Sequence, residues 1–195
     1  TPLQAGVPEA VEGHILPRHE AFAETAAALD EAAGADCTAG AVKPAYHEAF
    51  DGFIGVQHLA LGPLQDMGGP LALAFWPDTK GFTPRQLELL ISAANPETVT
   101  PEGFADQSVA AQGFFALERM LYDEGLNGYD AGSFSCALVQ AIARDIATKA
   151  ETLAAEWPAH AELLETAGEP GNARYLAPEE AAQALFTALI AGLEF

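Results

Sequence analysis

Glu118 is the residue whose surroundings point most directly to chemistry. Three polar residues interrupt the otherwise apolar helical segment over 109–122: Gln112, Glu118 and Arg119. A helix that is apolar on nearly all sides belongs in the middle of a bundle, so we expect Glu118 to be at least partly buried. A buried carboxylate must be paired, protonated or bound to a metal ion. Either it pairs with Arg119, Arg144, Lys149 or a neighbouring helix, or it lines a polar pocket inside the bundle.

The histidines are the other candidate metal ligands. His14 and His58 lie among apolar neighbours, where most histidines are hydrogen-bonded core residues and fewer are ligands. If the segment 62–82 folds over the bundle, His58, Asp78 and Glu118 converge, and His58 and Glu118 are then the expected metal ligands. The three other histidines lie beside glutamates and are expected to face solvent: His19, His47 and His160.

The elements that must position these residues are helices. Ala, Leu, Glu and Gln dominate, and runs with the alternation of β-strands are nearly absent, so the prediction is an all-α, up-and-down helical bundle. Apolar spacing and the Gly and Pro residues place the helices at about 8–33, 39–60, a short one from Thr83, 104–122, 133–157, 158–166 and 177–195. Thr38 is the expected N-cap of the second helix.

The Gly/Pro-rich segment 62–82 is predicted to be a long irregular connection that packs back onto the bundle. Such connections are uncommon in compact domains and are often functional. Trp76 within it is expected to be a core anchor, with a place in a binding cleft as the alternative.

Composition narrows the function classes. The 195 residues contain 28 acidic and 8 basic side chains, a formal charge of −20, so nucleic acid is a poor partner. No apolar run approaches the length of a transmembrane segment. Cys37 and Cys136 would be free thiols in a reducing compartment and could pair in an oxidising one. The sequence begins without an initiator Met, which fits a trimmed chain or a matured export product.

Short motifs along the whole chain resemble one family. Residues 113–118, Gly-Phe-Phe-Ala-Leu-Glu, resemble the GxHxxE motif of the imelysin-like proteins, the peptidase M75 group that includes iron-regulated periplasmic proteins. Four further segments are similar to family segments: 13–17, 56–63, the Phe-Trp-Pro-Asp segment 75–78, and 185–189. The resemblance implies a fold of two helical bundles, with residues 1–170 forming the first and 171–195 beginning a second that is truncated here.

The motif departs from the family at one position. In GxHxxE the His and Glu are three residues apart on one helix face, where both can reach one metal ion. Here Phe115 replaces the His, giving GxFxxE, and a benzene ring has no lone pair to donate. The resemblance implies a binding cleft around Gly113, Phe115, Glu118, Arg119, His14, His58, Trp76 and Asp78.

The resemblance also implies a function. We expect a periplasmic, non-catalytic binding protein associated with iron uptake or regulation, and the alternative is an M75-type metallopeptidase whose ligands lie elsewhere. A third alternative is a pure interaction bundle whose apolar last helix docks a partner. The implied cofactor is iron or another divalent metal, and the implied partner is a small ligand, a metal or a periplasmic iron-uptake protein. We also predict a disulfide between Cys37 and Cys136.

Overall fold

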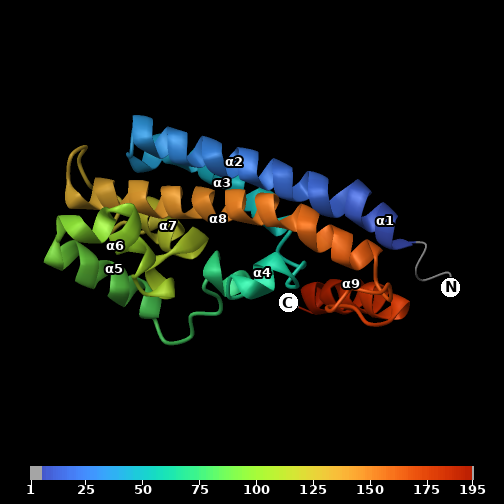
Figure 1. Ribbon diagram of the computed structural model, residues 1–195. Coiled ribbons are helices and arrows are strands. Elements are labelled where there is room, and N and C mark those ends of the chain that lie inside the picture. The colour runs from blue at the N-terminus through green and yellow to red at the C-terminus, as the bar shows by residue number, and fades with distance from the viewer. Residues whose placement is uncertain (1–5, 195) are drawn as a thin grey trace.

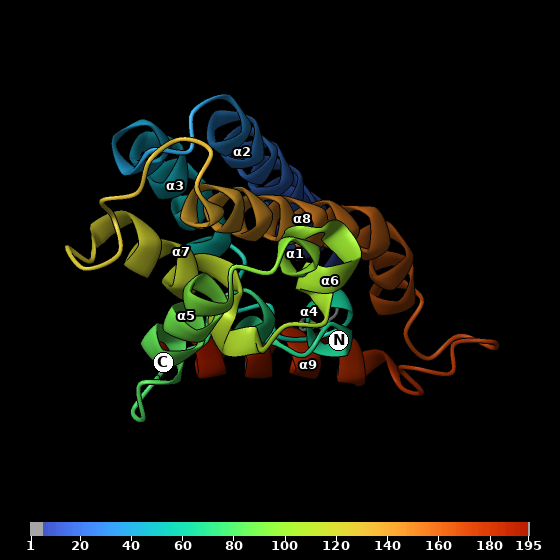
Figure 2. The same ribbon diagram turned by 90° about the vertical axis from the view of Figure 1, so that its left-hand side faces the viewer.

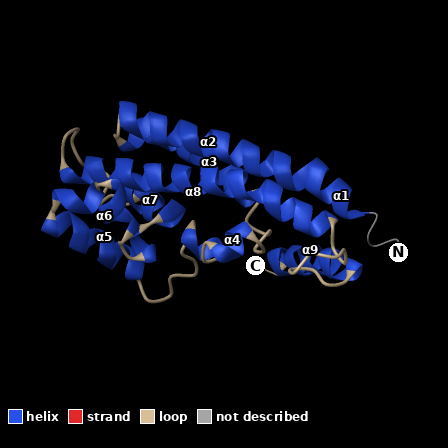
Figure 3. Cartoon of the chain, viewed as in Figure 1, coloured by secondary structure: helices blue, strands red, loops and turns tan. Residues whose placement is uncertain are grey.

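The structure is a computed structural model that describes residues 6–194. Every regular element within that range is a helix, as Figure 3 shows. The prediction of an all-α fold is therefore confirmed. The helical residue types named above and the recurrence of apolar side chains at helical spacing account for it.

Three long helices form the body of the molecule (Figure 1). They are α2 (Leu16–Ala35), α3 (Ala39–Ile54) and α8 (Phe134–Glu165). α2 continues a short helix α1 (Gly6–Ala10) and one π-helical turn (Val11–Ile15), so the N-terminal rod is unbroken. Seen end-on in Figure 2, α8 lies between the α2–α3 pair and the last helix, α9 (Pro178–Leu193).

The core lies where α2, α3 and α8 meet a shorter helix, α7 (Gly113–Tyr122). The rings of Phe22, Phe53 and Phe114 are fully buried there, and the Phe53 and Phe114 ring centres are 5.3 Å apart. Burial of large apolar side chains of this kind supplies most of the stability of a helical bundle.

The predicted helix over 104–122 is wrong, because the chain breaks it twice. A short helix α6 (Pro101–Ala105) ends before a 3₁₀ turn at Val109–Ala111, and α7 begins only at Gly113. Gly113 has φ +72°, a left-handed conformation that cannot continue an α-helix. Ahead of α6 lie α5 (Phe82–Ala93) and a 3₁₀ turn at Pro96–Val99.

Two other predicted helix ends are also wrong. Pro158 was expected to separate two helices, yet α8 passes through it, because the buried side chains of Trp157 and Leu164 hold both halves against the same core. α3 ends at Ile54 rather than near residue 60. Thr38 is the N-cap residue of α3 as predicted, although its side chain makes no capping hydrogen bond.

The connection 62–82 packs back onto the bundle as predicted. It contains one turn of helix, α4 (Pro63–Asp66), and a 3₁₀ turn at Pro70–Ala72. Leu64 and Leu73 within it are completely buried. The predicted last helix is present as α9, which ends at Leu193, and Phe195 lies outside the described residues.

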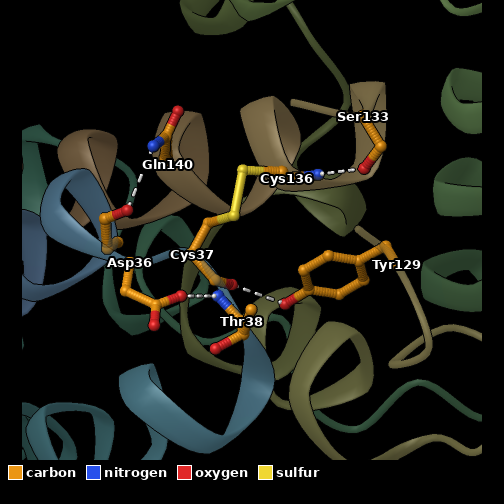
Figure 4. Close-up of a disulfide and its surroundings, with 8 residues drawn as sticks. Asp36, Cys37, Thr38, Tyr129, Ser133, Cys136 and Gln140 are labelled. Carbon is orange, nitrogen blue, oxygen red and sulfur yellow. Dashed lines mark hydrogen bonds between the residues drawn. A yellow bond between two sulfur atoms is a disulfide. The ribbon is translucent and has the colours of Figure 1, made fainter. Parts of the chain in front are cut away.

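A disulfide joins the chain just ahead of α3 to the first turn of α8 (Figure 4). Cys37 and Cys136 are bonded to each other, and their Cα atoms are 5.4 Å apart. Tyr129 donates a hydrogen bond to the Cys37 carbonyl at 2.9 Å, and Ser133 accepts one from the Cys136 N–H at 3.2 Å. These bonds fix the same corner of the bundle that the disulfide closes.

Candidate functional site

Glu118 lies on the exposed side of α7, so the expectation that it is buried is wrong. Because α7 has ten residues instead of nineteen, its polar residues form a single face with Glu118, Arg119 and Tyr122 toward solvent. Arg119 pairs with Asp123 at 3.7 Å and not with Glu118. The sequence pattern over 109–122 indicated a helix that is apolar on nearly all sides only because it counted residues 109–112 in the same helix.

The two other expected partners of Glu118 are also bound elsewhere. The guanidinium of Arg144 donates to the Val99 carbonyl at 2.7 Å. Lys149 forms a salt bridge with Asp145 at 2.7 Å. Within the described residues, neither cation forms a salt bridge with Glu118, so the position of its carboxylate follows from its place on α7.

Glu118 lines a hollow of about 380 Å³, which we call the Trp76 pocket. Four of its lining residues are aromatic, and its exposed or partly exposed charged residues, which we call its rim, supply three carboxylates and one guanidinium. The lining residues are Phe75, Trp76, Asp78, Thr83, Phe115, Glu118, Arg119, Tyr122 and Asp123. Aromatic rings beside an acidic rim suit a ligand that has a cationic group and an apolar face.

Trp76 is not the core anchor that we favoured from sequence, because 53% of it is exposed. Its indole packs on Phe115 with ring centres 5.4 Å apart and planes tilted by 36°. Phe115 in turn contacts Phe50 at 6.1 Å between ring centres. Trp76 thus lines a pocket, and its place in a binding cleft stays a prediction.

Gly113 is what brings Trp76 to Phe115. A Cβ at this glycine would lie 2.1 Å from the Leu73 carbonyl oxygen, so no other residue fits while the two segments are this close. The N–H of Phe114 donates to that same oxygen at 2.7 Å. The glycine of the motif thus allows the connection to approach the start of α7 and extend over Phe115.

Lys149 holds the connection from the other side. Its ammonium donates to the Ala72 carbonyl at 3.0 Å, to Oε1 of Gln112 at 2.9 Å and to Asp145 at 2.7 Å. Burial raises the pKa of Asp145, and the adjacent Lys149 ammonium partly offsets that rise. A partly buried charged pair therefore ties the connection to the segment just ahead of α7.

Asp78 serves the backbone more than the pocket. Its two carboxylate oxygens accept hydrogen bonds from the N–H groups of Phe82 and Thr83, both at 2.8 Å, at the start of α5. Desolvation raises the pKa of Asp78, but these N–H donors outweigh it and lower the pKa below its ordinary value. Asp78 is thus an N-terminal anchor of α5 that also contributes negative charge to the rim.

The predicted convergence of His58, Asp78 and Glu118 is wrong. His58 and His14 line a different cavity, which lies against α9, whereas Asp78 and Glu118 line the Trp76 pocket. Within residues 6–194, no group of three His, Cys, Asp or Glu side chains is arranged to hold a metal ion. Phe115 and Glu118 together do not fit the metal ion that the family motif implies, because the side chain of Phe115 has no atom that can bind a metal.

Two histidines expected at the surface are buried. His19 is completely enclosed, with its Nδ1 2.8 Å from the Ile15 carbonyl, and burial lowers its pKa to about 4. His160 lies 3.0 Å from the Tyr175 hydroxyl, and burial lowers its pKa as well. His47 faces solvent as predicted, 2.7 Å from the Tyr122 hydroxyl.

Sequence reasoning missed four pocket residues: Phe75, Thr83, Tyr122 and Asp123. Tyr122 is four residues after Glu118 and seven after Phe115, so helical spacing alone places all three on one side of α7. Thr83 carried no comparable signal, because it reaches the pocket only through the path of the connection.

Comparisons with known proteins identify one family that the chain resembles. The family model described as Imelysin, peptidase M75, matches residues 15–195. No protein among those with curated descriptions matches the chain. Within the described residues, no helix is long and apolar enough to cross a membrane.

One solved structure shares the fold. It is an imelysin-like protein from Psychrobacter arcticum 273-4, with a TM-score of 0.79 and 19% sequence identity. The likeness covers 98% of this chain and 59% of the other, so this chain spans about three fifths of that protein's length. Since the family model covers nearly all of the sequence, the chain belongs to the imelysin family.

Proposed function

We propose that this protein is a non-catalytic binding protein of the periplasm, associated with iron uptake or regulation, and that the Trp76 pocket takes its ligand. The observation that carries the proposal is the contact between Trp76 and Phe115 at 5.4 Å. It places a stacking platform at the position where the family motif has an imidazole. The rings of Trp76 and Phe115 can stack on a ligand but offer no atom that binds a metal ion, which supports binding in place of metal chemistry at this position.

Charge defines the ligand class. Glu118, Asp78 and Asp123 stand at the rim against the single cation Arg119, which is already paired with Asp123. A guanidinium or ammonium group seated on Trp76 would gain a cation–π contact and an ion pair with Glu118. In the proposed setting this group belongs to a basic side chain of an iron-uptake partner or to a cationic small ligand.

The periplasmic location is part of the proposal. Membership of the imelysin family supports it, and so does the disulfide between Cys37 and Cys136, a bond that persists in oxidising compartments. We further propose that residues 171–194 begin a second helical unit. In support, Phe186 and Leu193 on α9 are 58% and 78% exposed, and the solved relative is longer than this chain.

The experiment uses N-acetyl-arginine amide as a guanidinium probe and its neutral analogue, N-acetyl-citrulline amide, followed by calorimetry. We expect the wild-type protein to bind the arginine probe more tightly than the citrulline probe, and Trp76→Ala and Glu118→Gln each to weaken it at least tenfold. Leu89→Ala is the matched control, because Leu89 is exposed on α5 and lines no part of the pocket. Equal affinity for both probes, or no effect of either variant, would refute this ligand assignment.

The metallopeptidase alternative has its own test. Peptide cleavage is measured with zinc or iron added to chelator-treated protein. Cleavage that depends on the metal and persists in Trp76→Ala would establish the enzyme and overturn the proposed non-catalytic role. We expect no metal-dependent cleavage, because no three-ligand group occurs within residues 6–194.

A further inference from the structure

A second cavity lies away from the Trp76 pocket, between the N-terminal rod and α9. Its volume is about 690 Å³, and we call it the α9 cavity. Its walls are almost entirely apolar, with contributions from Val7, Ile15, Ile54, Leu185 and Leu189. Among the described residues, three that line it have polar side chains: His14, Gln57 and His58.

Backbone features place the two histidines on this wall. His14 lies in the π-helical turn Val11–Ile15, where the Leu16 N–H bonds to the Val11 carbonyl. Pro17 follows directly and has no N–H to donate, which explains why the regular helical ladder is interrupted here. His58 is held from the opposite side, because a Cβ on Gly192 of α9 would lie 2.3 Å from the His58 Cβ. The α9 backbone therefore rests directly on His58.

The two imidazoles are spaced for a shared ligand. Their ring centres are 5.4 Å apart and their planes are inclined by 42°. With metal–nitrogen bonds of about 2.0–2.1 Å, two imidazoles on one metal ion have ring centres about 5 Å apart at the tetrahedral angle of Zn²⁺ and about 4.5 Å apart at the right angle of tetragonal Cu²⁺. The observed separation is close to the first value, and a small rotation of the side chains would bring it to the second.

We propose that His14 and His58 together bind one divalent transition-metal ion, most tightly Cu²⁺, at the wall of the α9 cavity. Imidazole nitrogen is a good donor for Cu²⁺ and Zn²⁺, and the Irving–Williams order ranks Cu²⁺ above Zn²⁺. Two protein ligands leave the remaining coordination positions to water or to a small donor molecule within the cavity. This site is separate from the Trp76 pocket and does not depend on its function.

The surroundings of His58 favour its uncharged form. Burial lowers the pKa of His58, and the neighbouring His14 lowers it further, which favours the neutral imidazole that a metal ion needs. His19 lies close enough to interact electrostatically with both, but its Nδ1 is engaged by Ile15 and its ring packs on Trp157 at 4.8 Å. Its Nε2 has no hydrogen-bond partner, but no three His, Cys, Asp or Glu side chains among residues 6–194 are arranged to hold one metal ion, so His19 is not a third ligand.

The test is titration of the full chain with Cu²⁺ and, separately, Zn²⁺, followed by calorimetry and by electron paramagnetic resonance of the copper form. We expect one equivalent of Cu²⁺ with coupling to two nitrogen nuclei. His14→Ala and His58→Ala should each weaken binding at least tenfold and remove one nitrogen coupling. The matched control is His47→Ala, because His47 is exposed on α3 and lines neither cavity.

Two results would overturn the proposal. One is an affinity for Cu²⁺ that is unchanged in both His14→Ala and His58→Ala. The other is an equal loss in His47→Ala, which would identify scattered surface binding. The conservative variants His14→Gln and His58→Gln guard against misfolding, because they keep polar side chains of similar length and should show the same loss of nitrogen coupling with an unchanged circular dichroism spectrum.

Discussion

The N–H of Phe114 donates a hydrogen bond to the Leu73 carbonyl oxygen at 2.7 Å, and this bond joins the connection 62–82 to the first residue pair of α7. This junction sets the position of Trp76 relative to α7. Three residues after Leu73 comes Trp76, and one residue after Phe114 comes Phe115, so the bond brings the two rings into contact, with their planes tilted by 36°. Gly113 permits the bond because a larger residue would strike the same oxygen.

Gly113→Ala is therefore expected to destabilise the protein by about 3 kcal/mol. The cost combines the left-handed backbone at φ +72° with the clash against Leu73. Gly34→Ala is the matched control, because Gly34 lies inside α2 with open space at its Cβ position, and it should stabilise by up to about 1 kcal/mol. Urea denaturation measures both, and similar values for the two variants would contradict this account of Gly113.

The long helices could be predicted from the sequence, whereas this junction could not. Apolar residues at helical spacing specify the buried faces of α2 and α8 locally, so the pattern is sufficient to predict them. A positive φ at Gly113 is set by a carbonyl forty residues away, and no local pattern contains it. Counting Gly113 as an ordinary helical residue lengthened the predicted helix, and the lengthened helix then placed Glu118 in the interior.

The path of the connection 62–82 likewise could not be predicted from the sequence. The sequence offers candidate residues by type, but their grouping depends on where 62–82 lies across the bundle. That path brings Trp76 and Asp78 to Glu118 and leaves His58 beside His14. Trp76 was expected in the core because a large apolar side chain usually is, and burial statistics cannot identify a ring that lines an open pocket.

Lys149→Met should destabilise the protein by about 3 kcal/mol. The substitution leaves the Asp145 carboxylate without its partner and removes the donor to the Ala72 carbonyl. The double variant Lys149→Met/Asp145→Leu should recover most of the loss, because it removes both charges. A double-mutant cycle by chemical denaturation measures the coupling, and additive losses would contradict the pairing.

The same variant should respond to pH. The pKa of Asp145 is raised by burial, and without Lys149 nothing offsets that rise. The folded Lys149→Met protein then binds a proton more readily than its unfolded chain, so its deficit should shrink as the pH falls toward the ordinary pKa of an aspartate. Denaturation at several pH values checks this, with the wild-type protein as the reference. A deficit independent of pH would show that Asp145 is not left charged and buried.

Stability is expected to fall on mild acidification because of His19. Its pKa is about 4 when folded and 6.5 when unfolded, so the unfolded state binds more protons between those values. The stability is fully present above pH 6.5 and declines by about 3 kcal/mol as the pH drops to 4. His58 and His160, whose pKa values burial also lowers, add to the decline.

Unfolding free energies measured between pH 7 and pH 4 test this, with two variants. His19→Gln removes the titrating group and should flatten the slope, whereas His47→Gln changes an exposed histidine and should leave the slope as in the wild type. If His19→Gln and wild type declined in parallel, the neutral buried state of His19 would be refuted.

Reduction of the disulfide should lower the stability by about 4–5 kcal/mol. Cys37 and Cys136 are 99 residues apart in sequence, and in the chain-entropy model a loop of that length restricts the unfolded state by this amount. For a chain of this size we expect the melting temperature to fall by roughly 10–15 °C. The double variant Cys37→Ser/Cys136→Ser should melt at the reduced temperature with or without reductant. An unchanged melting temperature after both thiols become titratable would contradict the expectation.

Phe115→His should create a metal site beside Trp76. Phe115 and Glu118 are three residues apart on one side of α7, and both line the same pocket, so an imidazole at 115 can share a metal ion with the carboxylate at 118.

The measurement is best made in a His58→Ala background, where the pair proposed in the α9 cavity cannot contribute. Quenching of tryptophan fluorescence by Cu²⁺ should then report binding next to Trp76. Phe115→Gln and Phe115→His/Glu118→Gln are the controls, and each should bind at least tenfold more weakly. If Phe115→His bound Cu²⁺ no better than Phe115→Gln, the side chains at 115 and 118 would not share a face. The absence of an imidazole at 115 would then not account for the lack of a metal site in this pocket.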